Sequence, residues 1–296
     1  MDVTVGVGPD TWGIWFPEDD RQPPWARYLD EAAAAGYEWI ELGPFGYLPS
    51  DAAVAKAELA RRGLRAASAF VAGDLAEPGK SWSSIERQLH GQGRLLSELG
   101  AKFLLLVDDN YTDLLTGKLV SPPQLDRAGF QRLIDTTRKV AEIARKEYGL
   151  QLLFHPGAET HVETEEQVEE LLRRTEPELV SMVLDTGYHA YGGGDISAFL
   201  KRHADRIPYL HLKSFDSEIR AKVAAEKIPL AQAVAIGTFV ELSRGVVDFA
   251  ALRKTLEEID FRGFAIFEQD VFPVPFDMPL PIARRTRQYL REIGIG

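Results

Sequence analysis

The feature that most constrains the fold of this chain is a regular alternation between short apolar runs and longer segments with helical periodicity. Eight of the runs have the length and composition of buried strands, and turn residues and then a helical pattern follow each of them. The predicted strands are residues 3–7, 39–42, 65–71, 103–107, 150–155, 179–185, 207–213 and 264–269. Strict alternation of eight strands with helices predicts an α/β fold of the (β/α)8 TIM barrel type.

Local signals support this prediction. Ser83 with Glu86, and Thr164 with Gln167, have the spacing of capping boxes, and Gly149 stands where a long helical pattern ends. The alternative architecture is an open doubly wound sheet, but the glycine-rich first turn typical of that fold is missing. We therefore expect a closed barrel.

The 296 residues fit one barrel domain, and no low-complexity segment or linker divides them. One connection is longer than the alternation requires, because residues 214–244 lie between the seventh and eighth strands and contain a helical pattern at 218–235. We expect a single domain over residues 1–296, with this insertion at the carboxyl end of the strands, where barrels carry their active sites.

Composition excludes several classes of function. The formal net charge of −11 disfavours binding to nucleic acid and to anionic membranes, and the lack of cysteine excludes disulfides and metal–thiolate sites. No segment has the pattern of a secretion signal or the length of a membrane span. We expect a cytoplasmic protein whose metal ligands, if it has any, are histidines and carboxylates.

Polar residues at the ends of three consecutive predicted strands suggest such a site. Asp185 ends the sixth strand, His211 lies in the seventh, and Glu268 lies near the end of the eighth. In a barrel these side chains would converge, and their oxygen and nitrogen atoms suit Mn²⁺, Mg²⁺, Co²⁺ or Zn²⁺. Each could instead be an ordinary polar residue bound to a helix amide, but three on successive strands favour a metal site.

Several motifs, in this order and spacing, are similar to those of one known family. They are ELGPFGY at 41–47, HP at 155–156, LDTG at 184–187, HLK at 211–213 and EQD at 268–270. From about residue 3 to about 292, the chain resembles the inosose dehydratase branch of the xylose-isomerase-like barrel superfamily, the sugar phosphate isomerase/epimerase family. This resemblance implies a divalent metal, with Mn²⁺ as the expected ion, and a fourth ligand at His155.

The chain departs from the family pattern at two places. Dehydratase relatives read His-x-His followed by Gly-Thr, whereas this chain reads HPGAET at 155–160, which puts Glu159 at the position of a glycine. Glu159 could bind the metal or transfer a proton. Relatives have histidine directly after Asp-Thr-Gly, whereas here Tyr188 stands there and His189 follows, so His189 is a second catalytic candidate.

Lys213 is a third catalytic candidate, and three further residues are candidates for contact with a substrate. Lys213 could orient a substrate oxygen or protonate a leaving group, or it could be a solvated lysine at a strand end. Trp12 and Phe45 could pack against a sugar ring or belong to the core. Asp109 could accept hydrogen bonds from hydroxyl groups or form part of a turn.

The leading functional hypothesis is a metal-dependent lyase that acts on a keto-cyclitol or keto-sugar by α-proton abstraction and β-elimination. A ketose isomerase or epimerase with the same metal chemistry is the first alternative, and a non-catalytic sugar-binding subunit is another. A nuclease with the same barrel is disfavoured by the net charge and the shortage of histidines. We expect a small-molecule partner, no nucleic acid and no membrane, and assembly into a homo- or hetero-oligomer remains open.

Overall fold

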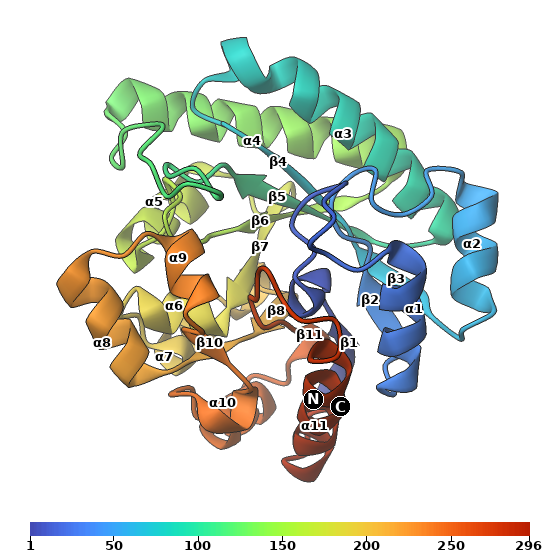
Figure 1. The fold of residues 1–296 in the computed structure, drawn as a ribbon. Helices are drawn as coiled ribbons and strands as arrows, with labels where there is room; N and C mark the ends of the chain where they lie inside the picture. Colours follow the sequence, from blue (N-terminus) through green and yellow to red (C-terminus); the bar gives the residue numbers. More distant parts are fainter.

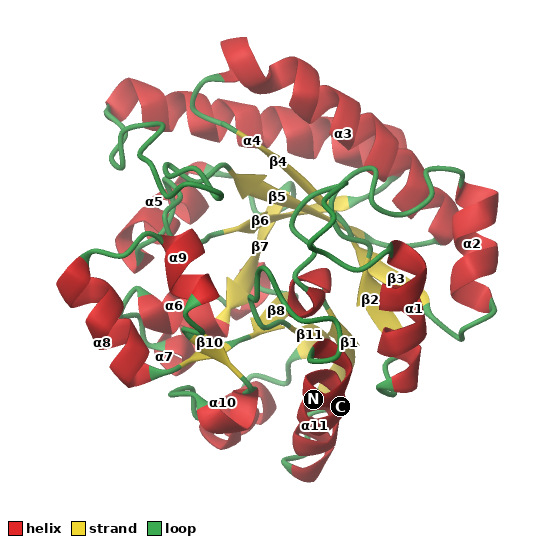
Figure 2. Cartoon of the chain, in the orientation of Figure 1, coloured by secondary structure: helices red, strands yellow, loops and turns green.

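In the computed structural model, which describes residues 1–296, parallel strands lie at the centre of the molecule and helices surround them (Figures 1 and 2). The strands of this sheet are β1 (Asp2–Val7), β2 (Trp39–Glu41), β3 (Arg65–Ser68), β4 (Phe70–Gly73), β5 (Phe103–Asp108), β6 (Gln151–His155), β7 (Val180–Asp185), β8 (Tyr209–Leu212) and β11 (Arg262–Phe267). Their order is β3-β2-β1-β11-β8-β7-β6-β5-β4, and every pairing is parallel.

The two ends of this strand order meet in the chain. Only Ala69 separates β3 from β4, and its carbonyl accepts a hydrogen bond of 2.9 Å from the amide of Leu105 in β5. Together, β3 and β4 correspond to the predicted third strand at 65–71. The nine segments therefore occupy eight positions around a nearly closed barrel, and the predicted TIM barrel is confirmed.

Helices follow the strands and cover the outside of the barrel (Figure 2). They are α1 (Trp25–Ala34), α2 (Ala52–Ala60), α3 (Pro78–Leu99), α4 (Arg127–Tyr148), α5 (Glu165–Arg174), α6 (Thr186–Tyr191), α7 (Ile196–Arg202), α8 (Ser217–Glu226), α9 (Leu230–Ala235), α10 (Phe249–Glu258) and α11 (Pro279–Glu292). None of them combines the length and the apolar character that crossing a membrane would require.

The helix signals in the sequence are confirmed in two cases and wrong in a third. Thr164 and Gln167 form the predicted capping box of α5, and Gly149 ends α4 with a φ of 68°. Ser83 caps nothing, because α3 begins five residues earlier at Pro78, where proline is favoured in the first turn.

The barrel has an outer and an inner core. Most buried apolar residues lie in one large cluster, which joins the strands to the surrounding helices. A smaller cluster of Ala67, Leu105, Leu153, Val183, Tyr209 and Ile266 fills the interior of the barrel. Because the interior is packed with side chains, a ligand can bind only at one end of the barrel.

The insertion after β8 forms structure of its own. Its two short strands, β9 (Ser214–Phe215) and β10 (Phe239–Val240), pair antiparallel, and α8 and α9 lie between them. The helical pattern at 218–235 is interrupted at Lys227, whose φ is 53°, and Pro229 then prevents the helix from continuing.

Candidate metal centre

Four neighbouring strands each contribute one side chain to a buried cluster of possible metal ligands. His155 ends β6, Asp185 ends β7, His211 lies in β8, and Glu268 directly follows β11. Asp185 and His211 are direct partners in the register of β7 and β8. The carboxyl ends of parallel strands thus bring together residues that are far apart in sequence.

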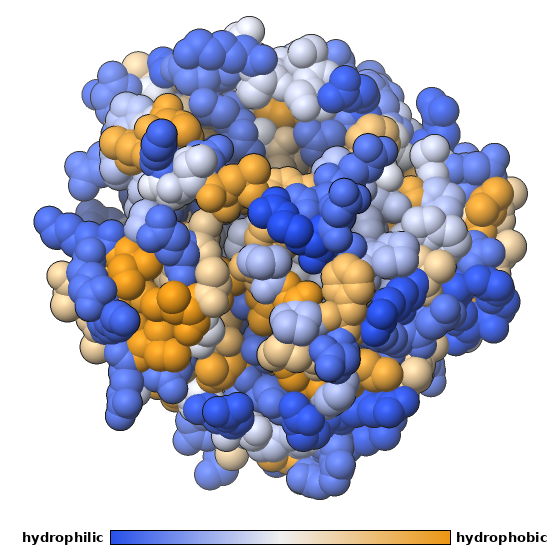
Figure 3. All heavy atoms as spheres, in the orientation of Figure 1, coloured by the Kyte–Doolittle hydropathy of each residue, from blue (hydrophilic) through white to orange (hydrophobic).

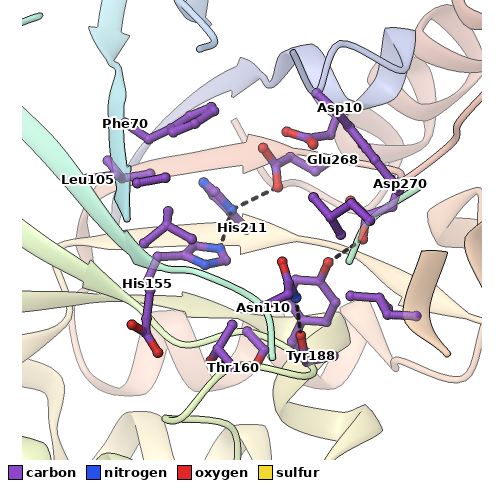
Figure 4. A pocket seen from close by; sticks show the side chains of 18 of the residues that line it. Asp10, Phe70, Leu105, Asn110, His155, Thr160, Tyr188, His211, Glu268 and Asp270 are labelled. Carbon is purple, nitrogen blue, oxygen red and sulfur yellow. Dashed lines mark hydrogen bonds and ion pairs between the residues drawn. The ribbon is translucent and has the colours of Figure 1, made fainter. Parts of the chain in front are cut away.

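The ligand atoms of this cluster are close enough to share one ion. His211 Nδ1 lies 3.0 Å from His155 Nε2 and 2.8 Å from Glu268 Oε2 (Figure 4). Asp185 Oδ2 lies 3.8 Å from both of these histidine nitrogens. All four ligand atoms lie within 4.8 Å of one another. Two ligands bound at about 2.1 Å and at right angles around a cation would be roughly 3 Å apart, so these spacings suit a single divalent ion.

The excess of buried negative charge in the cluster also favours a bound cation. Asp185 Oδ2 is buried and has no hydrogen-bond partner that meets the usual geometry, and its nearest cationic neighbour is Lys213 Nζ at 3.0 Å. The carboxylates of Glu41, Asp185, Glu268 and Asp270 are each only 3% exposed, and Lys213 is the only ammonium group among them. Buried negative charge in excess of its partners is costly, and a bound cation offsets that cost. The residues therefore fit a divalent metal site.

Hydrogen bonds orient two of the candidate ligands. His211 Nε2 lies 3.0 Å from Glu41 Oε1, which leaves Nδ1 of the same ring facing the cluster. Asp185 Oδ1 accepts the amide of Tyr188 at 2.8 Å and caps α6, which leaves Oδ2 facing the two histidines. Bonds of this kind fix the direction of ligand lone pairs.

Charges within the cluster shift the pKa values of its members. Burial opposes protonation of His211, but the carboxylates of Glu268 and Glu41 outweigh it and raise the pKa of the imidazole well above its usual value. Burial likewise opposes ionisation of Asp185, but Lys213 and the two histidines lower the pKa of this carboxyl group. A carboxylate without its proton is the form that binds a metal.

Lys213 lies beside the candidate ligands and is only 1% exposed. Its Nζ is 3.0 Å from Asp185 Oδ2, 3.3 Å from Glu268 Oε2 and 2.9 Å from Asp270 Oδ1. The same atom lies 4.1 Å from the ring centre of Tyr188, whose hydroxyl donates to Asp270 Oδ2 at 2.7 Å. Burial lowers the pKa of Lys213, but these carboxylates outweigh it and raise the pKa well above its usual value.

The cluster opens into a cavity of about 210 Å³. Three of the four candidate ligands line it together with Lys213, and Figure 4 shows several of the other lining residues. This volume holds several waters and suits a small ligand of about the size of a monosaccharide.

Asp109 is the one predicted substrate-binding residue that lines this cavity. It follows the end of β5 and reaches solvent at the mouth of the cavity. The pKa of Asp109 is raised to about 6, first because the surrounding protein displaces water from its carboxyl group, and then because Asp108 and Asp74 carry like charges.

The other two candidates for substrate contact lie elsewhere. Trp12 is fully buried, packs edge-on against Tyr28 and donates a hydrogen bond to Glu31, so it belongs to the core. Phe45 packs against Gly91 of α3 and lines a separate small hollow. Neither ring lines the main cavity.

Two predicted catalytic residues also face away from the cavity. Glu159 accepts a 2.9 Å hydrogen bond from the amide of Leu230 and another from the hydroxyl of Thr112, so its carboxylate joins two loops. His189 faces Glu165 at 3.3 Å and packs against Phe199, on the outer side of α6. The sequence argument placed both residues near the site, but it could not give the direction of their side chains.

Four residues of the site were not among the predicted ones, namely Asp10, Glu41, Tyr188 and Asp270. A signal existed for three of them, because Glu41 ends β2 and the two aspartates lie within three residues of the ends of β1 and β11. The carboxylate of Asp10 accepts no hydrogen bond from the protein, and burial with the charges of Glu268 and Asp270 raises its pKa well above the usual value.

Comparison with known proteins identifies the family. The model of the xylose isomerase-like TIM barrel family matches residues 29–293. The chain belongs to this family. An inosose dehydratase of Geobacillus thermodenitrificans is 28% identical to it over 296 residues, which cover 98% of this chain and 97% of the relative.

Two solved structures of similar proteins have the same barrel. The probable 3-DHS dehydratase AsbF of Bacillus anthracis superposes with a TM-score of 0.73 at 15% identity, over 98% of this chain and 99% of its own. The IolI protein, solved with a bound zinc atom, gives a TM-score of 0.70 at 16% identity, over 97% and 98% of the two chains. At such low sequence identity, these two similarities support only the barrel fold of the present chain.

Proposed function

We propose that this xylose isomerase-like barrel is a divalent-metal-dependent lyase that acts on a keto-cyclitol or keto-sugar. It removes the proton next to the ketone and expels the hydroxyl group on the following carbon. The observation that carries this proposal is the buried set of four ligands beside Lys213, at the wall of a cavity of monosaccharide size. The near full-length similarity to an inosose dehydratase supports it.

The metal would be held by His155, Asp185, His211 and Glu268. We favour Mn²⁺ because two of the four ligands are carboxylates, and Mg²⁺, Co²⁺ and Zn²⁺ suit the same donor set. The zinc atom of the IolI structure supports a divalent ion in a barrel of this fold. When bound, the ion would polarise the ketone and stabilise the negative charge that develops as the neighbouring C–H bond breaks.

The protein's own residues supply the proton transfers. Asp10 is the candidate base, because its carboxyl group lines the cavity and a cation bound by the nearby Glu268 would offset the charges that raise its pKa and so favour the carboxylate form. Lys213 donates a proton to the departing hydroxyl group, so that a carbon–carbon double bond forms and water leaves. Tyr188 and Asp270 hold the ammonium group of Lys213 in place. Glu159 and His189 take no part in this scheme, because both side chains point elsewhere.

The test is to incubate the Mn²⁺-loaded protein with an inosose in D₂O and to follow both the loss of water and the label at the carbon next to the ketone. A lyase releases one water and gives an enone or enol chromophore. Exchange of the α-hydrogen with all hydroxyls retained would instead identify an isomerase or epimerase. Asp10→Asn should keep the metal and lose both reactions, and Asp109→Asn is the matched control at the cavity mouth.

A shielded base can return the original hydrogen, so a substrate labelled at that carbon completes the test. An active enzyme with neither a primary isotope effect in single-turnover reactions nor any movement of the label would overturn the proton-abstraction proposal. No reaction with inososes or ketoses and no bound metal would favour the non-catalytic alternative.

A further inference from the structure

The cavity that contains the candidate ligands is strongly acidic. One ammonium group and no arginine line the cavity, compared with six carboxyl groups. These belong to Asp10, Glu41, Asp108, Asp109, Glu268 and Asp270. The ammonium group of Lys213 already contacts carboxylates at 2.9 and 3.0 Å. A phosphate or carboxylate group on a ligand would therefore meet repulsion from these carboxyl groups and would find no free lysine or arginine.

The opposite side of the cavity is apolar. We define the apolar wall as Phe70, Leu105, Val107, Leu114, Leu230 and Val234, all of which line the cavity. Phe70 and Leu105 are direct partners in the register of β4 and β5. In Figure 4 these two side chains lie on one side of His211, and Asp10, Glu268 and Asp270 lie on the other.

Two of the polar groups that line the cavity already have partners within the protein. The side-chain amide of Asn110 donates to the carbonyl of Ala158, and the hydroxyl of Thr160 donates to the carbonyl of Gly157, both at 2.9 Å. A hydroxyl group of a ligand that faced the wall would lose its water and find few partners. Each polar group left without a partner in this way weakens binding.

The insertion contributes two residues of α9 to the apolar wall. Leu230 and Val234 lie on α9, only 6% and 3% exposed, in a cluster with Phe239 of β10 and Phe272. In Figure 3 apolar side chains gather over the region of α6, α8 and α9. The hydrogen bond from the Leu230 amide to Glu159 fixes the start of α9 over the cavity.

We propose that the apolar wall is a subsite for an apolar substituent, so that the natural substrate is a neutral keto-cyclitol or keto-sugar bearing an O-linked alkyl or aryl group. The keto part of this statement rests on the proposed function, whereas the subsite rests on the lining of the cavity. The polar part of the ligand lies against the metal cluster and Lys213, and the substituent lies against Leu105, Leu230 and Val234.

The test measures binding, so it needs no turnover. The Mn²⁺-loaded full-length protein is titrated with myo-inositol, with its mono-O-methyl and mono-O-propyl ethers at each ring position, and with inositol monophosphates. For at least one ring position, affinity should rise about threefold to fourfold for each added carbon, the ratio that corresponds to about 0.8 kcal/mol for each buried methylene. The monophosphates should bind more weakly than myo-inositol itself.

Two positions at the end of α9 give a matched pair of variants. Val234 faces the cavity, whereas Ile236, which directly follows α9, is 45% exposed. Val234→Asn should remove most of the preference for the propyl ether, a loss of about tenfold. Ile236→Asn should leave it unchanged. If Val234→Asn fails to fold, Val234→Thr replaces a methyl group by a hydroxyl of similar size and should reduce the preference in the same direction.

The subsite is overturned if no ether binds better than myo-inositol, if a monophosphate binds most tightly, or if the Val234 variants keep the full preference. Complete absence of binding in the whole series overturns it as well. Failure of the proposed function has a different signature, since a protein that prefers the propyl ether through Val234 but leaves inososes and ketoses unchanged has the subsite without the lyase reaction.

Discussion

Glu41 Oε1 and His211 Nε2 lie 3.0 Å apart at the ends of β2 and β8, which are not neighbours in the barrel. The same carboxylate oxygen accepts hydrogen bonds from Ser68 at 2.9 Å and from Tyr209 at 2.7 Å. A histidine that donates one ring N–H to a carboxylate presents its other nitrogen to a metal in a fixed direction. Glu41 is therefore a positioning residue for His211.

Glu41→Ala should weaken metal binding by about 10-fold to 100-fold without loss of the fold, because His211 would lose the partner that orients its ring. Titration of the metal-free protein with Mn²⁺ measures this change, and circular dichroism checks the fold. Glu41→Gln, whose amide oxygen can still accept from His211, should lose less. Equal affinity in Glu41→Ala and the wild type would show that His211 needs no such partner.

Asp185 and Asp195 offer a second matched pair, because both side chains cap helices and only Asp185 belongs to the metal cluster. Serine is also a good N-cap, so Asp185→Ser should keep the start of α6 but lose the oxygen that faces the histidines. We expect Asp185→Ser to lose stoichiometric metal and Asp195→Ser to retain it, as measured by elemental analysis after dialysis. Full metal content in Asp185→Ser would remove Asp185 from the ligand set.

The fold could be predicted because each of its elements is specified locally. The run at 103–107 is apolar throughout and forms β5, which is covered on both faces, and the capping box at Thr164 starts α5 where the pattern places it. The break between β3 and β4 could not be predicted, because it depends on how the strand bends around the barrel. The eighth strand ends at Phe267, two residues before the predicted end.

The residues of the candidate site could be predicted where their position at the end of a strand is enough to bring them together. Asp185, His211 and Glu268 converge because neighbouring parallel strands end at the same level. Glu159 shows where this reasoning stops, since it follows β6 by only four residues and yet points to another loop. Side-chain direction in a loop depends on tertiary contacts that leave no periodic signal in the sequence.

Glu159 has a backbone φ of 57°, in the left-handed region that favours glycine, and its carboxylate holds α9 over the cavity. Glu159→Gly relieves the backbone strain but removes the hydrogen bonds to Leu230 and Thr112. We expect little change in overall stability and faster hydrogen exchange at the Leu230 amide, with a lower kcat/KM. Glu159→Gln keeps an acceptor for that amide and should keep its protection. Unchanged exchange in Glu159→Gly would show that α9 is held by its apolar contacts alone.

The last prediction concerns pH and uses two aspartates of the loop after β5. In the folded protein the partial loss of water around its carboxyl group and the neighbouring carboxylates raise the pKa of Asp109 to about 6, whereas an unfolded chain has a value of about 3.9. Between these values the folded state binds a proton that the unfolded state has released, so the contribution of Asp109 to stability is full below about pH 4 and is lost as pH rises through about 6. Asp109→Asn should therefore gain stability relative to the wild type as pH rises over this range.

Asp113 is the control because its shift has the opposite sign. Hydrogen bonds from the Thr116 side chain and amide lower its pKa, so its contribution is present above the unfolded value and is lost as pH falls. Asp113→Asn should lose stability relative to the wild type at neutral pH, and the difference should shrink in acid. Thermal unfolding of the three proteins from about pH 2 to about pH 8 measures both differences. A difference between Asp109→Asn and the wild type that does not change with pH would show that solvent at the cavity mouth screens the carboxyl group fully.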